Sequence, residues 1–473
     1  MRERVNINQY LRIKQSRKGT ASLDLILSVV ALAMPTFSAF AAGRTVVGYY
    51  YFWDRQSFPC TAIEYSKLSC IAYAFVVPDS NGNIYPESGT MKSFLYPQLI
   101  TTAHNDYVKV VISVGGYNAA ATTAFSILSG KAAARANFAG TMKAFCLQNG
   151  FDGVDIDWEY PTQSDRANFV LMMQALRDSL NASGKQLSLS ITAPGYVGSG
   201  YDINHLYPLL DWVGVMTYDY HGSWTSNSGP ISPLYTGDAE GSVSTSISSF
   251  LQSTSIPASK LFMGLAFYGY NFKCKGLYQT LDTAYAPAVT YAQAVADQKN
   301  GWTYHWDDAS KTPYLTDASN THVIPFDDTV SIRYKCDYLK SQNLGGVIIW
   351  KLGLDNLGSS QPLLETVWNQ LNPETAVDYP GLAAVPTSTA LLQNYPNPFN
   401  PSTMINYQLS TTGHVALKVY DLLGREVSTL VDARQNAGNH SVTFNASRLA
   451  SGVYISVLSV NGRLFTQTML YLK

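Results

Sequence analysis

Four acidic residues stand close together in an apolar stretch of the chain. The segment 150–161, GFDGVDIDWEYP, contains Asp152, Asp155, Asp157 and Glu159 among residues that favour β-strands. Close carboxyl groups in a buried strand cannot all ionise, so at least one is expected to keep its proton near neutral pH. A protonated carboxyl group next to ionised ones can act as a general acid. The segment therefore predicts an acid/base site, with Glu159 as the acid.

The spacing of these residues predicts the direction in which each side chain points. Side chains alternate between the two faces of a strand, which rises by about 3.3 Å per residue. Asp155, Asp157 and Glu159 therefore share one face, and Trp158 lies on the other face among apolar neighbours. Asp152 precedes the strand and is expected to be structural. A metal site or a buried structural network is the alternative for the acidic row, but no His joins it; we expect no metal ion and no cofactor.

Strand-like and helical segments alternate between residues 44 and 372. Helical patterns occupy 134–149 and 165–182, and the expected strands are 45–53, 68–77, 108–116, 153–160, 187–194, 212–220, 261–270 and 345–350. Strands that end in polar or aromatic residues favour an α/β fold of the (β/α)8 TIM barrel type, with the active site at their carboxyl ends. A doubly wound open sheet is the alternative. The segment 271–325 is too long for a plain connection and predicts a small insertion after strand 7, on one wall of the cleft.

Several motifs in this region together resemble glycoside hydrolase family 18, the chitinases and their relatives. DGVDIDWE resembles the D-x-x-D-x-D-x-E signature of that family. Five other motifs occur along the chain in the order typical of that family, two before this signature and three after it: AYAF (72–75), SVGGY (113–117), VMTYDYHGSW (215–224), GLAFYGY (264–270) and LGGVIIW (344–350). The resemblance spans about 44–372. It implies an enzyme that hydrolyses β-1,4 bonds between the N-acetylglucosamine units of chitin.

The resemblance also implies a retaining, substrate-assisted mechanism through an oxazolinium ion, which sets this family apart from glycosidases with a carboxylate nucleophile. Glu159 would protonate the leaving oxygen and later activate water. Asp157, above Asp155, would hydrogen-bond the acetamido N–H of the substrate. Tyr218 would donate a hydrogen bond to the acetamido carbonyl, and Asp219 would contact the distorted sugar.

Most of the expected substrate-binding residues are aromatic. The resemblance places Trp350 beneath the sugar at the cleavage site and Met216 at the pocket floor. The other expected substrate-binding residues are Tyr49, Phe75, Tyr117 and Trp224. For Trp302 and Trp306, in the insertion, the sequence does not decide between the cleft wall and another position, and His221 is expected to be a structural or rim residue.

Three positions depart from the pattern of the family. Tyr117 stands where Trp is frequent, Tyr270 stands where Arg is frequent, and KLGLD follows the final Trp in place of acidic or small residues. These changes bear on substrate length and affinity more than on the type of reaction. Two other functions stay open: an endo-β-N-acetylglucosaminidase acting on N-glycans, and a non-catalytic chitin-binding lectin, which would typically lack the acid that is present here as Glu159.

Both ends of the chain indicate export. A basic start, an apolar run at 23–34 and an A-x-A triplet predict a signal peptide over 1–41, with an uncleaved membrane anchor as the alternative. The catalytic barrel would then occupy 42–372, a linker rich in Pro, Thr, Ser and Ala 373–391, and a β-sandwich 392–473.

The motifs NYPNPFNPST, VYDLLGREV and SGVY in the last segment resemble the sorting domain of type IX secretion substrates. This resemblance implies the secretion machinery as a partner and an extracellular location, free or on the cell surface. A sugar-binding or adhesive sandwich is the alternative.

The composition agrees with a protein of more than one domain. The chain has 473 residues, 14% of them charged, and a net charge of −1. This charge argues against a surface for nucleic acid, and we expect a monomer without a stable membrane anchor. The chain has five cysteines, so at least one thiol is free, and only Cys60 and Cys70 are close enough in sequence to suggest a local disulfide, which the sequence leaves open.

Overall fold

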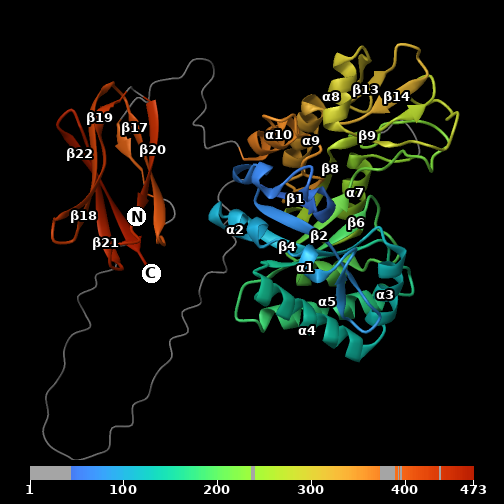
Figure 1. Ribbon diagram of the computed structural model, residues 1–473, viewed down its shortest axis with the longest axis horizontal. Coiled ribbons are helices and arrows are strands. Elements are labelled where there is room, and N and C mark those ends of the chain that lie inside the picture. Colours follow the sequence, from blue (N-terminus) through green and yellow to red (C-terminus); the bar gives the residue numbers. More distant parts are fainter. Residues whose placement is uncertain (1–43, 236–239, 373–388, 393, 395–396, 436–437) are drawn as a thin grey trace, which may run out of the picture. The chain divides into compact units, whose positions relative to one another are not determined.

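The computed structural model describes residues 44–235, 240–372, 389–392, 394, 397–435 and 438–473 (Figure 1). The chain divides into two compact units, Met1–Asn372 and Pro373–Lys473. The expected signal peptide, 1–41, and most of the expected linker, 373–391, lie outside the described residues. No described helix is long and apolar enough to cross a membrane.

The first unit is built around a closed barrel of parallel strands. The sheet order is β1-β15-β8-β7-β6-β5-β4-β2, and pairing of β1 with β2 closes the barrel. The short strand β3 (Ile84–Pro86) adds to β2 in antiparallel orientation. The barrel strands are β1 (Thr45–Tyr51), β2 (Cys70–Pro78), β4 (Lys109–Gly116), β5 (Gly153–Trp158), β6 (Ser188–Pro194), β7 (Trp212–Met216), β8 (Leu261–Ala266) and β15 (Gly346–Trp350). This topology confirms the predicted TIM barrel.

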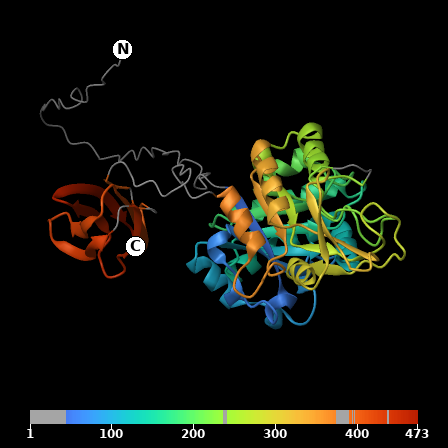
Figure 2. The same ribbon diagram turned by 90° about the horizontal axis from the view of Figure 1, so that it is seen from above.

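Helices surround the barrel, as Figures 1 and 2 show from two directions. The α-helices are α1 (Met91–Phe94), α2 (Pro97–Asn105), α3 (Ala119–Ser129), α4 (Ala132–Asn149), α5 (Arg166–Asn181), α6 (Ile203–Leu206), α7 (Val243–Ser253), α9 (Thr329–Ser341) and α10 (Pro362–Leu371). Short 3-10 helices occupy Phe52–Arg55, Cys60–Ala62, Tyr65–Lys67, Tyr207–Leu209 and Ala258–Lys260.

Two apolar layers hold the barrel together. The larger layer lies between strands and helices and contains Ile156, Trp158, Phe138 and Phe169. A smaller cluster fills the inside of the barrel, where the rings of Trp212 and Phe262 stack with centroids 5.6 Å apart. Outward and inward side chains of the same strands feed the two layers, as the alternation along each strand requires.

Four barrel strands are shorter than the sequence predicts at their carboxyl ends. The strand expected over 45–53 ends at Tyr51. The strand expected over 153–160 ends at Trp158, the one over 212–220 ends at Met216, and the one over 261–270 ends at Ala266 before a separate strand, β9 (Tyr268–Tyr270). After Met216 the chain cannot stay extended, because Asp219 has a φ of +62°. The residues just after Trp158 and Met216 therefore lie on loops above the barrel, and those after Ala266 lie on β9.

The insertion after the seventh barrel strand has its own small sheet. Its strands run in the order β10-β14-β13-β12 and are antiparallel, while β9 pairs with β11. Figure 1 shows α8, β13 and β14 together at one edge of the unit. The bounds are β10 (Phe272–Lys273), β11 (Ala288–Thr290), α8 (Tyr291–Lys299), β12 (Thr303–Asp307), β13 (Thr312–Thr316) and β14 (His322–Pro325).

The second unit consists of two antiparallel sheets around one core. One sheet has the order β16-β17-β20 and the other β19-β18-β21-β22. Alternate residues of β18 and β21 are buried, including Val415, Leu417 and Leu458, and these pack with Ile405 of β17. The bounds are β16 (Ala390–Leu391), β17 (Ser402–Leu409), β18 (Gly413–Asp421), β19 (Glu426–Gln435), β20 (Gly438–Asn445), β21 (Gly452–Val460) and β22 (Arg463–Tyr471).

Candidate active site

The acidic row on β5 and just beyond it points to the inside of the barrel. Asp155 hydrogen-bonds groups inside the barrel, and Asp157 and Glu159 line a cavity at its mouth. Trp158 belongs to the outer apolar layer, where it stacks on Phe125 with centroids 5.2 Å apart. The predicted alternation of the side chains is confirmed. Asp152 lies before the strand, where its carboxylate accepts a hydrogen bond from the Val110 N–H, as expected of a structural residue.

Asp155 is the deepest carboxyl group and is held by three hydroxyl groups. Tyr49 donates to it at 2.7 Å, Ser113 at 2.8 Å and Ser190 at 2.7 Å. These donors come from β1, β4 and β6, on both sides of β5 in the barrel. Burial raises the pKa of Asp155, and the three hydrogen bonds oppose that shift because they stabilise the charged form.

Asp157 is buried without such donors. Its Oδ1 atom has no hydrogen-bond partner among the described residues. Burial raises the pKa of Asp157 well above its ordinary value, and the charges of Glu159 and Asp155 raise it further. Burial and these two charges therefore favour the neutral form of Asp157, and its unpaired oxygen can accept a hydrogen bond from a ligand.

Glu159 is the highest of the three acids. Burial raises its pKa to about 7, with a further contribution from the charge of Asp219, while a hydrogen bond with Tyr160 opposes the rise. The backbone carbonyl of Glu159 accepts a hydrogen bond of 2.7 Å from the Thr122 hydroxyl, which holds the chain at this point. A carboxyl group with a pKa near 7 can both give and take a proton at neutral pH.

A pair of glycines allows β4 to pass close to these groups. Gly115 has a φ of +120°, and a Cβ atom there would lie 2.0 Å from the Asp157 carbonyl oxygen. Gly116 has a φ of +81°, and its Cβ would lie 2.8 Å from the ring of Phe75. The two glycines of the SVGGY motif therefore make room for the acid and for the ring.

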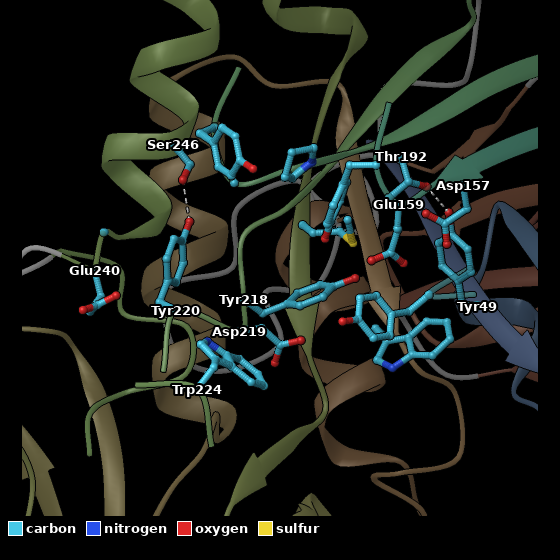
Figure 3. Close-up of a pocket in the computed structure, with 18 of the residues that line it drawn as sticks. Tyr49, Asp157, Glu159, Thr192, Tyr218, Asp219, Tyr220, Trp224, Glu240 and Ser246 are labelled. Atoms are coloured by element: carbon cyan, nitrogen blue, oxygen red, sulfur yellow. Dashed lines mark hydrogen bonds between the residues drawn. The ribbon is translucent and has the colours of Figure 1, made fainter. Parts of the chain in front are cut away.

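The acids line a cavity of about 990 Å³ at the carboxyl ends of the strands (Figure 3). Figure 3 shows Glu159, Asp157, Tyr218 and Asp219 directed toward the same space. Aromatic rings make up much of the wall: Tyr49, Tyr51, Phe75, Tyr117, Tyr160, Tyr196, Tyr218, Tyr220, Trp224, Tyr270 and Trp350. Rings with a few polar groups between them suit the apolar faces and the hydroxyl groups of sugars.

Trp350, at the end of β15, lies in a group of rings on one wall. Its ring stacks on Phe75 with centroids 6.0 Å apart and an interplanar angle of 23°, and Tyr49 lies 5.7 Å away. These neighbours fix the orientation of the indole, so that it can present a flat surface to a ligand.

The loop after β7 supplies Tyr218 and Asp219. Asp219 accepts hydrogen bonds from the Tyr268 hydroxyl at 2.6 Å and the Tyr270 hydroxyl at 3.1 Å. Burial raises the pKa of Asp219, and these two hydrogen bonds oppose the rise. The loop thus holds a carboxyl group in the cavity and keeps it near Glu159.

The loop after β7 is anchored from behind by a buried ion pair. Lys335 pairs with Asp327, and both side chains are almost fully buried. Lys335 also donates to the Ser232 hydroxyl at 2.7 Å, and Ser232 donates to the Thr217 carbonyl at 2.7 Å. The chain of contacts ends one residue before Tyr218.

The structure brings most of the predicted site residues into one cavity. Asp155 lies beneath the cavity and does not line it. Tyr117 and Trp224 stand at the rim, with 89% and 61% of their surface exposed. The predicted residues on the cavity wall are Tyr49, Phe75, Tyr117, Asp157, Glu159, Met216, Tyr218, Asp219, Trp224 and Trp350.

The residues that the sequence left open lie elsewhere. Trp302 packs against the outer apolar layer, and Trp306 lies 5.9 Å from the ring of Tyr334. Neither is among the described residues that line the cavity. His221 is buried, with Nδ1 3.0 Å from the Pro230 carbonyl oxygen, in keeping with a structural role.

Several residues of the wall are not predicted from the sequence. Tyr160 follows Glu159 directly, and Thr192 is close enough to the Tyr49 hydroxyl, at 2.8 Å, for a hydrogen bond. Tyr51 is the last residue of β1 and Ser246 lies in α7. Four more wall residues lie outside helices and strands, where no strand periodicity indicates direction: Glu87, Tyr196, Tyr220 and Glu240. Thr192 could have been predicted from the sequence. It stands two residues after Ser190 on β6, so both side chains point to the inside of the barrel, where Ser190 hydrogen-bonds Asp155.

Neither metal-ligand clusters nor disulfides occur in the described residues. No group of three or more His, Cys, Asp or Glu side chains there could hold a metal ion. Cys60, Cys70, Cys146, Cys274 and Cys336 are all free and buried. The Cys60–Cys70 disulfide that the sequence left open is therefore not formed in this structure.

Comparison with protein families gives two matches. The model of "Glycosyl hydrolases family 18" matches residues 45–355. The model of "Secretion system C-terminal sorting domain" matches residues 393–470.

Individual proteins agree with the first match. The chain is 28% identical to "Chitinase A1" of Niallia circulans, in an alignment that covers 74% of this chain and 62% of that protein. It therefore spans less than two thirds of this curated relative. Among solved structures, a family 18 N-acetylglucosaminidase from Paenibacillus barengoltzii is similar, with a TM-score of 0.61, 29% identity, and coverage of 69% of this chain and 100% of that one. The family 18 chitinase of Cycas revoluta in complex with (GlcNAc)3 gives a TM-score of 0.64 at 25% identity, over 69% of this chain and 99% of that one.

Proposed function

This chain belongs to glycoside hydrolase family 18, and we propose that it is a secreted chitinase that hydrolyses β-1,4 bonds between N-acetylglucosamine units. The observation that carries the proposal is the stack of acids at the barrel mouth. Glu159, with a pKa of about 7, stands over a buried Asp157 with an unpaired oxygen, in a cavity walled by rings. The complex of the Cycas revoluta chitinase with (GlcNAc)3 supports a ligand of this class.

The first chemical step would use an atom of the substrate as nucleophile. The acetamido oxygen attacks the anomeric carbon, the bond from that carbon to the glycosidic oxygen breaks, and Glu159 gives its proton to the leaving oxygen. The ring closed in this way is an oxazolinium ion with a positive charge. In the second step water attacks the same carbon and gives a proton to Glu159. The bond from that carbon to the acetamido oxygen breaks and restores the neutral acetamide, so the product keeps the β configuration.

The neighbours of Glu159 would assist these steps. Asp157 would accept a hydrogen bond from the acetamido N–H, which its unpaired Oδ1 supports. Asp155, below it, would modulate the charge on Asp157, since its own charge raises the pKa of Asp157. Tyr218 would donate to the acetamido carbonyl and Asp219 would contact the distorted sugar. Trp350 and Phe75, stacked on each other, would support the sugar ring, with Tyr49 and Met216 beneath and Tyr117 and Trp224 at the rim.

The two ends of the chain would serve export. The match to a secretion sorting domain over 393–470 supports transport by the type IX machinery. We propose that residues 1–41 are a signal peptide, 42–372 the catalytic unit, 373–391 a linker and 392–473 the sorting domain. The enzyme would then act outside the cell on a polymer too large to enter.

Substrates of two kinds test the proposal. The purified protein is incubated with chitin oligosaccharides in one arm and with a glycoprotein that carries high-mannose N-glycans in the other. Mass spectrometry then measures the products. Release of short N-acetylglucosamine oligosaccharides from the first supports a chitinase. Release of the N-glycan alone would overturn that and indicate an endo-β-N-acetylglucosaminidase, and tight binding without cleavage would indicate a lectin.

A further inference from the structure

The cavity wall carries acidic side chains and, among the described residues, no basic side chain to match them. Among the described residues that line the cavity, five are acidic and none is Lys, Arg or His. Asp157, Glu159 and Asp219 take part in the proposed chemistry, but Glu87 has no role in it. Carboxylates also bind the hydroxyl groups of neutral sugars, so the setting of Glu87 must decide what this residue recognises.

Glu87 lies next to the stacked rings of Phe75 and Trp350 on the cavity wall. It follows the short strand β3, and its backbone N–H donates to the Phe75 carbonyl oxygen at 3.2 Å. Phe75 in turn stacks on Trp350. The carboxyl group of Glu87 therefore stands on the wall beside the rings on which a sugar would lie.

The Glu87 carboxyl group is fixed by one hydroxyl. Tyr51 donates a hydrogen bond of 2.7 Å to Oε2, and the Tyr51 ring is itself wedged against Phe75 and Trp350, at centroid distances of 6.1 and 6.4 Å. A single donor to one oxygen orients the carboxylate and leaves the acceptor capacity of the other oxygen for a ligand.

A lysine close to Tyr51 is paired with another acid and not with Glu87. Lys351 Nζ lies 5.1 Å from the centre of the Tyr51 ring. Its charge is paired with Asp54, with which it makes an ion pair. Glu87 is thus an ionisable acceptor in a sugar cleft without a protein cation among the cavity-lining residues described.

From this setting we propose that Glu87 binds the protonated amino group of a glucosamine unit, so that the cleft prefers partly deacetylated chitin to the fully acetylated polymer. The inference rests on the proposed function. The unit whose acetamido group attacks must stay acetylated, and the glucosamine would be the neighbouring unit that reaches Glu87. A carboxylate and an ammonium group form a charge-assisted hydrogen bond, which a neutral acetamide cannot match.

Substitution of Glu87 by Gln tests the proposal, because Gln can still accept the Tyr51 hydrogen bond but carries no charge. We measure kcat/KM for fully acetylated oligosaccharides and for oligosaccharides of the same length with one glucosamine at a known position. For Glu87→Gln, the ratio of kcat/KM for the best glucosamine-containing substrate to that for the acetylated one should fall about threefold to tenfold. Added salt should lower the ratio for the wild type and leave that for the variant nearly constant.

Glu365→Gln is the matched control. Glu365, in α10, has half of its side chain exposed and is not among the residues that line the cavity. This variant makes the same change in net charge and should keep the wild-type ratio. An unchanged ratio in Glu87→Gln, or an equal loss on both substrates, overturns the proposal; equal loss would show that Glu87 binds a sugar hydroxyl.

A binding measurement separates this inference from the proposed function. In a Glu159→Gln background, calorimetry gives the Kd of acetylated and of glucosamine-containing oligosaccharides with and without Glu87→Gln. Loss of the preference for glucosamine on removal of Glu87 supports the inference even if the wild type cleaves neither ligand, and cleavage of neither would count against the proposed function alone. If the Glu159→Gln protein binds both ligands equally well, the inference is overturned.

Discussion

The Tyr49 hydroxyl, on β1, donates a hydrogen bond of 2.7 Å to the Asp155 carboxylate, on β5, across the inside of the barrel. The two strands are not neighbours in the sheet. Together with the Ser113 and Ser190 hydroxyls, this bond favours the charged form of Asp155, while Asp157 above it has no comparable donor. The lower acid thus holds charge more readily than the upper one, and this difference keeps a proton near the cavity.

Tyr49→Phe should destabilise the protein because it removes one of these donors from a buried carboxylate. We expect the free energy of unfolding at neutral pH to fall by about 1–3 kcal/mol, as is usual for a hydrogen bond to a charged group. The donor lowers the pKa of Asp155 in the folded state, so the loss should be largest where Asp155 is ionised and should shrink as the pH falls through its pKa. Urea unfolding at several pH values measures this difference.

Tyr50→Phe is the control for that series. The Tyr50 hydroxyl donates to the Phe58 carbonyl, a neutral acceptor, at 2.7 Å. The cost of this substitution should not depend on pH in the acidic range. If the two variants show the same pH dependence, the ionisation of Asp155 is not what Tyr49 stabilises.

The pH profile should report the ionisation of Glu159. Because its pKa is raised to about 7 and the proposed first step needs its proton, kcat/KM should fall as the pH rises above about 7. The charge of Asp219 contributes to that rise, so Asp219→Asn should lower the pKa of Glu159 and move the alkaline limb to lower pH. The profile of kcat/KM against pH measures the shift, apart from any loss of rate.

Asp337→Asn serves as its control, since Asp337 has 64% of its side chain exposed and pairs with Lys340 at the surface. In this variant the alkaline limb of the profile of kcat/KM against pH should stay where it is in the wild type. A limb that stays in place in Asp219→Asn would show that the charge of Asp219 does not act on Glu159.

Much of this site could be predicted because side chains alternate between the two faces of a strand. The period of two placed Asp157 and Glu159 on the inner face and Trp158 on the outer face, and the structure has them there. The rule failed past the strand ends. It extended one strand to residue 220, although the positive φ of Asp219 ends the extended conformation earlier.

The position of Glu87 could not be predicted from the alternation of side chains along a strand. It follows a three-residue strand that pairs with β2 in antiparallel orientation, and its contact with Tyr51 joins residues 36 positions apart. No local pattern in the sequence encodes such a contact. In the second unit, the exposed residues of β19 and β22 weaken the apolar alternation by which a strand is recognised in a sequence.

Lys335→Met should be strongly destabilising because it leaves Asp327 buried without its ion-pair partner. Breaking a buried pair typically costs about 3–5 kcal/mol, which urea unfolding would detect. The double variant Lys335→Met, Asp327→Asn removes both charges and should recover part of the loss. If the single and double variants are equally unstable, the unpaired charge is not the cause.

Ser232→Ala tests the link from this pair to the site. It removes the donor to the Thr217 carbonyl while keeping the ion pair. We expect kcat to fall, since the loop that carries Tyr218 loses an anchor. Expressed as free energies, this loss in kcat should be larger than the loss in the free energy of unfolding. An unchanged kcat would show that the loop is held by its other contacts.

Removal of residues 392–473 should leave hydrolysis intact. The cavity is lined only by residues of the first unit among those described, and each unit has its own apolar core. The purified truncated protein should match the full chain in kcat/KM for chitin oligosaccharides, while its export from the producing cell should stop. Loss of activity in the purified truncation would show that the second unit helps to build the site.

The rate of hydrolysis by Glu159→Gln tests the central claim most directly. Gln keeps the shape of the side chain and its hydrogen-bonding capacity but cannot supply the proton, so binding of a chitin oligosaccharide should persist while its cleavage slows by about 10²–10⁴-fold. Mass spectrometry of the products, with calorimetry to show that the ligand is bound, gives both quantities on one preparation. Cleavage at the wild-type rate by a variant that binds normally would contradict the assignment of Glu159 as the acid.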